Sequence, residues 1–357
     1  MIPVAKPEIG KAERRAVDRV MRSGLLAQGP EVANFEKEFS KFVEDRECVA
    51  VNSGTSALHV ALLTLGIGKG DEVIVPSFTF AATANSVALT GATPVFVDID
   101  PQTFCIDPVA IVNAITAKTK AIQVVHLYGL PADMTAIMKI AKKYKLLVVE
   151  DAAQAHLASI EGKSVGTFGD AAAFSFYPTK NMTSGEGGMI VFKEPSAARI
   201  GRLYRNQGME KRYENEIVGF NLRMTDIHAA IGRVQLTKLS EKTQRRQENA
   251  AFLSVNISSF VDAPIIPSGH SHVFHQYTIK VQGDRDSFAS KLTDLGVGSG
   301  VYYPIPVHEL PAFGKKKSLP NTSQVCKQVL SLPVHPALSK KDLKKIVEAV
   351  NKASSAK

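Results

Sequence analysis

The stretch AIQVVHLYGLPADMTAIMKIAKKYKLLVVED, residues 121–151, holds the pattern that decides the fold. It contains two apolar runs, Ala121–His126 and Leu146–Glu150, and each has the length and β-branched content of a buried strand. Between them, Met134–Tyr144 has apolar residues at helical spacing and is long enough for a crossover helix. A strand, a helix and a second strand in this order predict two parallel strands, and therefore an α/β fold.

The same alternation of short apolar runs and helical stretches extends to both sides of this unit. Helices are expected at Ser56–Leu65 and Pro108–Ile115. Further strands are expected at Cys48–Val51, Glu72–Val75, Pro94–Asp98, Ala171–Phe176 and Met189–Phe192. We therefore predict one mostly parallel sheet covered by helices.

The pattern changes after Lys193. A mostly helical stretch is expected up to about Val255, and short strands return at Gln276–Val281 and Gly298–Tyr303. The sequence thus predicts a large α/β domain over residues 1–240, with an N-terminal arm, and a smaller α+β domain over residues 241–357.

Composition excludes several classes of protein. The 357 residues are 45% hydrophobic and 22% charged, and no apolar run approaches the roughly 18 residues that span a membrane. Cys48, Cys105 and Cys326 lie too far apart for a CxxC pair, and the N-terminus lacks the pattern of a signal peptide. We expect a soluble protein of the reducing cytoplasm, with no membrane partner.

The net charge of +9 is concentrated at the C-terminus, where residues 315–357 contain ten lysines and two acidic residues. Ser339 and Asp342 form a predicted capping box, and apolar residues follow at helical spacing at Leu343, Ile346, Val347 and Val350. The lysines then occupy a solvated helix face, although attraction of an anionic partner stays open. With the rest of the chain near neutral, no nucleic-acid partner is expected.

The segment Asn52–Ser56 is a candidate phosphate site. It follows a predicted strand and opens a predicted helix, so it offers free backbone N–H groups, hydroxyls and the positive end of a helix dipole. Alternatively, Ser53 is only the N-cap of that helix.

Two further strand ends carry groups suited to chemistry. Asp151, with Glu150, ends one predicted strand, and Lys180 follows another, where burial would lower its pKa and free its amine as a nucleophile. Together with the phosphate site, an acid and a lysine are the parts that pyridoxal 5'-phosphate requires, and Phe80 is placed to stack on a ring. Taken singly, these residues also fit a helix cap, a surface lysine and a core aromatic.

Two competing motifs fail in their context. Gly66–Asp71 contains a glycine-rich run, but it follows a helix and precedes a strand, so it predicts a turn. His270, His272 and His275 have no acid or cysteine nearby, which disfavours a metal site.

Five segments make the chain resemble the DegT-type (DegT/DnrJ/EryC/StrS) sugar aminotransferases. They are SGTSALHVALLTLGIGKGDEVIVPSFTFAATANSV (residues 53–87), VHLYGLPADM (125–134), EDAAQAH (150–156), GDAAAFSFYPTKN (169–181) and NLRMTDIHAA (221–230). The resemblance implies a fold-type I pyridoxal phosphate enzyme, similar to aspartate aminotransferase, that forms a homodimer with shared active sites.

The resemblance also implies roles for single residues. Lys180 would be the Schiff-base lysine, Asp151 the partner of the pyridine nitrogen, and Gln154 a neighbour of the cofactor hydroxyl. The remaining implied cofactor contacts are the stacking ring Phe80, the phosphate ligands Gly54, Thr55 and Ser175, and Asn221 reaching the phosphate of the neighbouring subunit.

A lysine at position 180 favours transamination, because related dehydratases carry histidine there. The expected substrates are an amino acid, L-glutamate by resemblance, and a nucleotide-linked keto sugar. The segment TSGEGG, residues 183–188, resembles members that aminate C4, although cyclitol aminotransferases can also carry it. Leu157 and Tyr302 depart from residues common in the family, which leaves the sugar open.

Several residues are candidates for contacting the substrate. The guanidinium groups of Arg205 and Arg223 are suited to bind the donor carboxylate or the sugar diphosphate. The alternative is that both side chains simply lie at the protein surface. Further candidates are Glu186, Tyr303 and His308. The alternatives to a sugar aminotransferase are a cyclitol aminotransferase and a regulatory protein that keeps this fold without catalysis.

Overall fold

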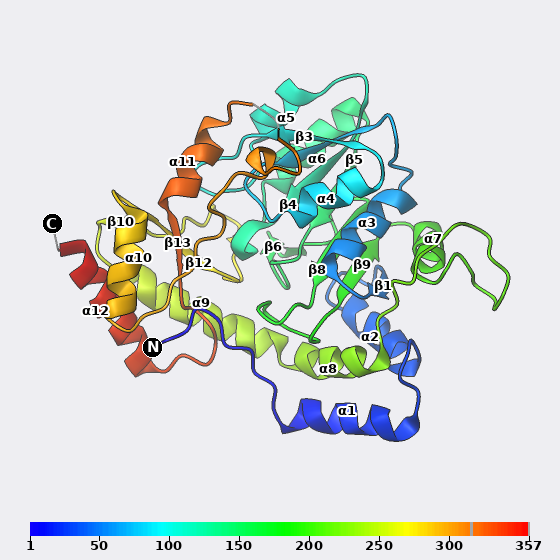
Figure 1. Cartoon of the computed structure of the whole chain (residues 1–357), viewed down its shortest axis with the longest axis horizontal. Coiled ribbons are helices and arrows are strands. Elements are labelled where there is room, and N and C mark those ends of the chain that lie inside the picture. The colour runs from blue at the N-terminus through cyan, green and yellow to red at the C-terminus, as the bar shows by residue number, and fades with distance from the viewer. Residues whose placement is uncertain (315–316, 356–357) are drawn as a thin grey trace.

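A seven-stranded sheet forms the centre of the larger part of the molecule, and a second core lies beside it (Figure 1). The computed structural model describes residues 1–314 and 317–355. The strands of the large sheet are β1 Glu47–Val51, β2 Glu72–Pro76, β3 Thr93–Val97, β4 Thr119–Val125, β5 Leu147–Asp151, β8 Ala171–Ser175 and β9 Gly188–Phe192. The helices of this part are α1 Lys11–Ser23, α2 Pro30–Ser40, α3 Gly54–Thr64, α4 Ala82–Leu89, α5 Pro108–Ala114, α6 Met134–Tyr144, α7 Pro195–Arg205 and α8 Asp226–Thr237.

The strand order is β1-β9-β8-β5-β4-β2-β3, and β9 alone among these strands runs against its neighbours. The prediction of a mostly parallel sheet is therefore confirmed. Helices cover both faces, with α3, α4 and α7 on one face and α2, α5, α6 and α8 on the other. Because both faces are buried, the strands are mainly apolar, and β8 is buried at all five positions.

The unit around residues 121–151 forms as expected. β4 and β5 are parallel neighbours, and α6 between them has the predicted bounds. Asp133 begins α6, because its side chain accepts a hydrogen bond from the N–H of Ala136. Lys145, in a left-handed conformation, ends the helix two residues before β5 begins.

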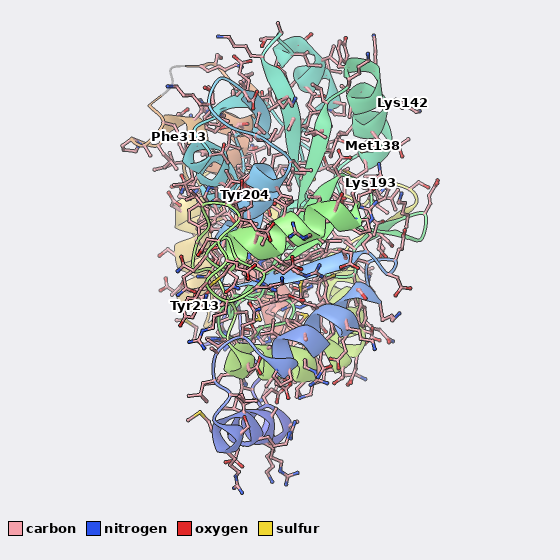
Figure 2. All side chains as sticks on the ribbon, turned by 90° about the vertical axis from the view of Figure 1, so that its right-hand side faces the viewer. Met138, Lys142, Lys193, Tyr204, Tyr213 and Phe313 are labelled. Atoms are coloured by element: carbon pink, nitrogen blue, oxygen red, sulfur yellow. The ribbon has the colours of Figure 1, made fainter. Side chains whose placement is uncertain are left out.

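The chain between α7 and α8 is not helical, so the predicted helical stretch is wrong over residues 206–225. This segment leaves the body and returns, with isolated bridges joining Asn206 to Asn221 and Met209 to Asn215. Tyr213, labelled in Figure 2, lies on this excursion and is 79% exposed. The excursion returns the chain to the end of β1, where the N–H of Asn52 donates to the carbonyl of Leu222.

A second core is built on a three-stranded sheet with the order β10-β12-β13. Its elements are α9 Leu239–Asn256, β10 Val261–Asp262, β12 Tyr277–Val281, α10 Arg285–Asp294, β13 Val329–Leu332 and α12 Lys340–Ser355. The helix α11 Pro320–Gln328 precedes β13 and packs Val325 and Cys326 into the core of the larger part. The helices α9, α10 and α12 pack on the three-stranded sheet together with Ile2 from the N-terminal arm. The arm thus contributes to the core of the predicted small domain, although the predicted boundary places it with the large one. The short strands β6 Ser159–Ile160, β7 Lys163–Ser164 and β11 His270–Ser271 form a third sheet.

The strand predicted at Gly298–Tyr303 does not form. Only a single bridge joins Gly300 to Ser331 of β13. The ring of Tyr302 folds back over Gly300, where a β-carbon would lie 2.6 Å from it.

The C-terminal helix begins with the predicted capping box. The N–H of Asp342 donates to Ser339 Oγ, and Asp342 Oδ2 accepts from the N–H of Ser339. The lysines at 315, 316 and 357 of the basic tail lie outside the described residues. Among the helices of the described part, none is both long and apolar enough to cross a membrane.

Candidate active site

The predicted site residues gather at the carboxyl edge of the large sheet. Asp151 and Ser175 are the last residues of β5 and β8, and these two strands pair side by side. Gly54 begins α3 and packs against Ser175, since a β-carbon at position 54 would lie 2.7 Å from that of Ser175. Strand ends at this edge are where α/β sheets bind their ligands.

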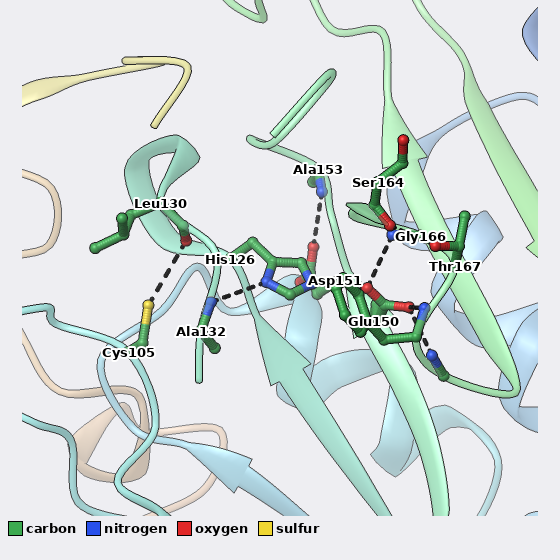
Figure 3. A network of polar contacts seen from close by, with 12 residues as sticks. Cys105, His126, Leu130, Ala132, Glu150, Asp151, Ala153, Ser164, Gly166 and Thr167 are labelled. Carbon is green, nitrogen blue, oxygen red and sulfur yellow. Dashed lines mark hydrogen bonds and ion pairs between the residues drawn. The ribbon is translucent and has the colours of Figure 1, made fainter. Parts of the chain in front are cut away.

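The Asp151 carboxylate is buried, with 6% of the residue exposed. Its Oδ2 accepts a hydrogen bond from Thr83 Oγ1 at 2.8 Å. Its Oδ1 accepts one from the N–H of Ala153 at 3.2 Å, which Figure 3 shows. Burial raises the pKa of Asp151, and the hydrogen bond from Thr83 and the charge of Lys180 act against that rise. An acid held in this way is suited to pair with a buried cation.

Lys180 lies in a turn after β8, where its N–H donates to the carbonyl of Tyr177. Its side chain is half-buried. Burial lowers the pKa of the Lys180 ammonium to about 8, against the opposing attraction of Asp151. The amine is therefore free as a nucleophile and base from about pH 8 upward, closer to neutrality than for an ordinary lysine.

The start of α3 is the segment predicted to hold an anion. Ser53 is the N-cap, because its Oγ accepts from the N–H of Ser56 at 3.1 Å, so the N-cap interpretation is correct. This bond does not use the N–H groups of Gly54 and Thr55, which belong to the unpaired first turn of the helix. The cap and the phosphate site are therefore compatible, and Ser175 lies against the cradle.

Gln154 and Phe80 lie beside Tyr303. Gln154 Oε1 accepts from the N–H of Tyr128 at 2.7 Å, and its Nε2 donates to the hydroxyl of Tyr303 at 3.1 Å. The rings of Phe80 and Tyr303 are 5.9 Å apart. Because Phe80 is 59% exposed, it is not a core aromatic, and its ring is free to stack on a ligand.

Two predicted substrate residues are held by hydrogen bonds within the protein itself, although the buried Arg205 Nε has no partner in the described part of the chain. Arg205 is buried, forms an ion pair with Glu36 and donates to the carbonyl of Ala50. The buried His308 ring hydrogen bonds to Ser77 Oγ through Nδ1 and to the carbonyl of Lys317 through Nε2.

The other predicted contacts are more open. Arg223 is partly buried and donates to Asn206 Oδ1 at 2.9 Å. Asn221 and Glu186 are exposed. Asn221 lies on the irregular segment after α7, so it is available to a second copy of the chain.

Glu150 has a different task from its neighbour Asp151, and the sequence did not separate the two. Its fully buried carboxylate accepts hydrogen bonds from His126 Nε2 and from three backbone N–H groups (Figure 3). Those three groups belong to Gly166, Phe168 and Gly169. The N–H of Ala132 donates to His126 Nδ1, so the ring proton is on Nε2. Glu150 thus fixes the loop before β8. The alternation of side chains along a strand could have separated Glu150 from Asp151, because adjacent strand residues point to opposite faces of the sheet.

Replacing Glu150 with glutamine is expected to lower the free energy of unfolding by about 3 kcal/mol, because an amide NH₂ would face N–H donors. Burial acts to raise the pKa of Glu150, but its hydrogen bonds outweigh that effect, so the pKa lies below its ordinary 4.5. Its contribution is therefore complete above about pH 4.5 and is lost as the pH falls. Urea unfolding checks this, with the exposed Glu248→Gln as the control; equal stability of the two variants would contradict it.

The two motifs that the sequence disfavoured as sites are part of the local structure. Gly66–Asp71 is a turn in which the N–H of Gly68 donates to Asp71 Oδ2. The ring of His272 stacks on Phe274 with 4.0 Å between centroids. Across residues 1–314 and 317–355, no group of three or more histidine, cysteine, aspartate or glutamate side chains could hold a metal ion.

A comparison with known families matches residues 7–351 to the DegT/DnrJ/EryC1/StrS aminotransferase family. The chain belongs to this family. It is 42% identical over 354 residues to the "Pleiotropic regulatory protein" of Geobacillus stearothermophilus, covering 97% of this chain and 94% of that one. It is 41% identical over 346 residues to the "dTDP-3-amino-3,6-dideoxy-alpha-D-galactopyranose transaminase" of Aneurinibacillus thermoaerophilus, covering 96% and 95%.

Solved structures agree with this assignment. DesV of S. venezuelae, crystallised with a ketimine intermediate, superposes with a TM-score of 0.94 at 39% identity, covering 97% of this chain and 95% of that one. The ntda protein of Bacillus subtilis, with bound pyridoxamine phosphate, superposes with a TM-score of 0.90 at 35% identity, covering 97% and 83%. The chain is therefore a pyridoxal phosphate-dependent aminotransferase with the predicted fold. Its buried acid, lysine of lowered pKa and helix-start cradle fit that cofactor.

The pH dependence of cofactor uptake follows from Lys180. Below about pH 8 the ammonium form predominates and cannot attack the cofactor aldehyde. The rate at which cofactor-free protein takes up pyridoxal phosphate covalently is therefore expected to rise about tenfold per pH unit up to about pH 8, and then to level off. Stopped-flow absorbance measures this rate, and a rate that stayed constant across this range would contradict the lowered pKa.

Proposed function

We propose that this aminotransferase transfers an amino group from L-glutamate to a nucleotide-linked keto sugar. The observation that carries the proposal is the meeting of Asp151, Lys180 and the start of α3 at one edge of the sheet. A transaminase named for a dTDP-linked amino sugar, 41% identical to this chain, supports the class of substrate.

Each of the main residues has a defined task in this proposal. Bound pyridoxal phosphate supplies a ring that accepts electrons from the substrate carbon. Lys180 Nζ holds the cofactor and moves the proton at the carbon that bears nitrogen, for which its pKa of about 8 is suited. The Asp151 carboxylate would hold the ring nitrogen and its proton. Gln154 would bind the ring hydroxyl, and Phe80 would stack on the ring.

The phosphate of the cofactor would be held by the N–H groups of Gly54 and Thr55 and by the hydroxyls of Thr55 and Ser175. Asn221 of a second copy would complete this site, which makes the active protein a homodimer. The exposure of Asn221 in one copy supports this arrangement. The three unpaired, buried cysteines support the cytoplasm as its compartment.

Arg223 is the better candidate for an anion of the substrate, because the Arg205 guanidinium already pairs with Glu36. Tyr303 and Glu186 remain candidates for contacts with the sugar. We propose that His308 acts on the site indirectly, by holding the segment after Tyr303 to Ser77 at the end of β2.

The sugar carbon that receives the amine is a more detailed part of the proposal. The TSGEGG segment, which includes the exposed Glu186, favours C4, but this segment is short. The name of the Aneurinibacillus relative, which matches nearly the whole chain, contains a 3-amino sugar. We therefore expect C3 first and keep C4 as the second candidate.

A cyclitol substrate and a purely regulatory role are the alternatives. One relative is named a pleiotropic regulatory protein. The electrostatic attraction between Asp151 and Lys180, a lysine of lowered pKa, supports catalysis, because a binding protein has no need of such a lysine.

The test is to offer the protein L-glutamate together with 3-keto and 4-keto nucleotide sugars and a keto-inositol, and to detect aminated product by mass spectrometry. Formation of a nucleotide-linked amino sugar supports the proposal, and the position of its amine assigns the carbon. Amination of the keto-inositol alone would replace the nucleotide sugar with a cyclitol. No amination with any amino donor would contradict the proposed function.

A further inference from the structure

A chain of buried hydroxyls stands behind Asp151. Thr83, near the start of α4, is fully buried, and Thr79, in the loop after β2, is 2% exposed. The Thr79 and Thr83 hydroxyl oxygens are 2.8 Å apart, and Thr83 Oγ1 is 2.8 Å from Asp151 Oδ2. The sequence motifs give neither threonine a role.

The direction of these hydrogen bonds can be deduced. A hydroxyl has one proton, and Thr83 donates it to the Asp151 carboxylate. In the hydrogen bond between the two threonines, the Thr79 hydroxyl must then be the donor and Thr83 Oγ1 the acceptor. The protons therefore all point toward Asp151, and hydrogen bonds in such a directed chain strengthen one another.

Hydrogen bonds to its backbone fix the position of Thr83. Its carbonyl accepts hydrogen bonds from Gln123 Nε2 at 2.9 Å and from Ser86 Oγ at 2.8 Å, and all three residues are fully buried. Its N–H donates to the carbonyl of Phe80. Moving the Thr83 hydroxyl away from Asp151 would break several buried hydrogen bonds, so the geometry is held in advance of any ligand.

A donor aimed at Oδ2 favours the charged carboxylate over the protonated acid. This matters because Asp151 is buried, and burial disfavours charge. We propose that Thr83, supported by Thr79, is a positioning residue that keeps the Asp151 carboxylate charged and aimed at the ring nitrogen of the cofactor. This inference rests on the proposed role of Asp151 and adds the residues that sustain it.

The test measures the affinity of cofactor-free protein for pyridoxamine phosphate and for its deaza analogue, which has carbon in place of the ring nitrogen. Thr83→Val removes the hydroxyl and keeps the shape. We expect it to weaken binding of pyridoxamine phosphate by about 10- to 100-fold and to leave binding of the deaza analogue unchanged. Thr83→Ser should restore binding. The matched control is Thr64→Val, because the buried Thr64 hydroxyl has no partner within the described part of the chain.

Equal losses for both ligands in Thr83→Val, or no loss, would overturn the inference. If that variant does not fold, Thr79→Val takes its place, with a smaller loss expected for the nitrogen-containing ligand alone; absence of that loss would also overturn it. Asp151→Asn tests the role of Asp151 separately from the role of Thr83. If it does not discriminate between the ligands, the proposed role of Asp151 is wrong; if it does and Thr83→Val does not, only the role of Thr83 is wrong.

Discussion

Replacing Lys180 with alanine is expected to reduce turnover by at least about 10³-fold, since the same amine attaches the cofactor and moves the substrate proton. Its lowered pKa of about 8 equips it for both tasks. The absorbance band of the lysine-bound cofactor should also disappear, while free pyridoxal phosphate continues to bind at the α3 cradle. Steady-state assays and absorbance spectra of the purified variant measure both effects.

Lys193→Ala is the matched control, because the Lys193 side chain is 53% exposed and only loosely paired with Asp170 at 3.9 Å. It should keep wild-type turnover and the wild-type spectrum. A Lys180→Ala variant that turned over at the rate of this control would show that another group performs the chemistry.

Asp151→Asn is the second variant with a large expected effect. Asparagine keeps the shape of the side chain but removes the charge that would hold a proton on the ring nitrogen. We expect turnover to fall by about 10²- to 10³-fold, as for the loss of other aligned electrostatic groups. The KM for the amino donor should change little, because Asp151 does not belong to the predicted substrate contacts.

Asp262→Asn serves as its control, since Asp262 lies on the second core and pairs with Lys280 near the surface. The Asp151→Asn variant should also hold pyridoxamine phosphate less tightly than this control does. Unchanged turnover in Asp151→Asn would remove Asp151 from the proposed site.

The architecture of the large part was predictable because buried parallel strands leave a strong signal in the sequence. The stretch 121–151 gives both strands and the helix between them, and α6 has the predicted bounds. The residues that end β5 and β8, Asp151 and Ser175, could be placed at one edge for the same reason. A strand end identifies the face of the sheet on which ligands bind.

The features that were not predictable from the sequence depend on contacts between segments that lie far apart in the chain. Arg205 looked free to bind an anion, yet Glu36, far away in the chain, occupies it. Thr83 meets Asp151 only because β2 and β5 lie on either side of β4 in the sheet. The prediction at Gly298–Tyr303 was wrong because Gly300 makes only one isolated bridge, to the distant Ser331, which no periodicity reveals.

The most direct test of the proposed transamination is the absorbance spectrum of the protein loaded with pyridoxal phosphate, recorded on addition of L-glutamate and then of a 3-keto nucleotide sugar. We expect glutamate to replace the lysine-bound band with the band of pyridoxamine phosphate, and the keto sugar to restore the first band. A lysine-bound band that persists with glutamate and with every other amino donor would contradict transamination by this protein.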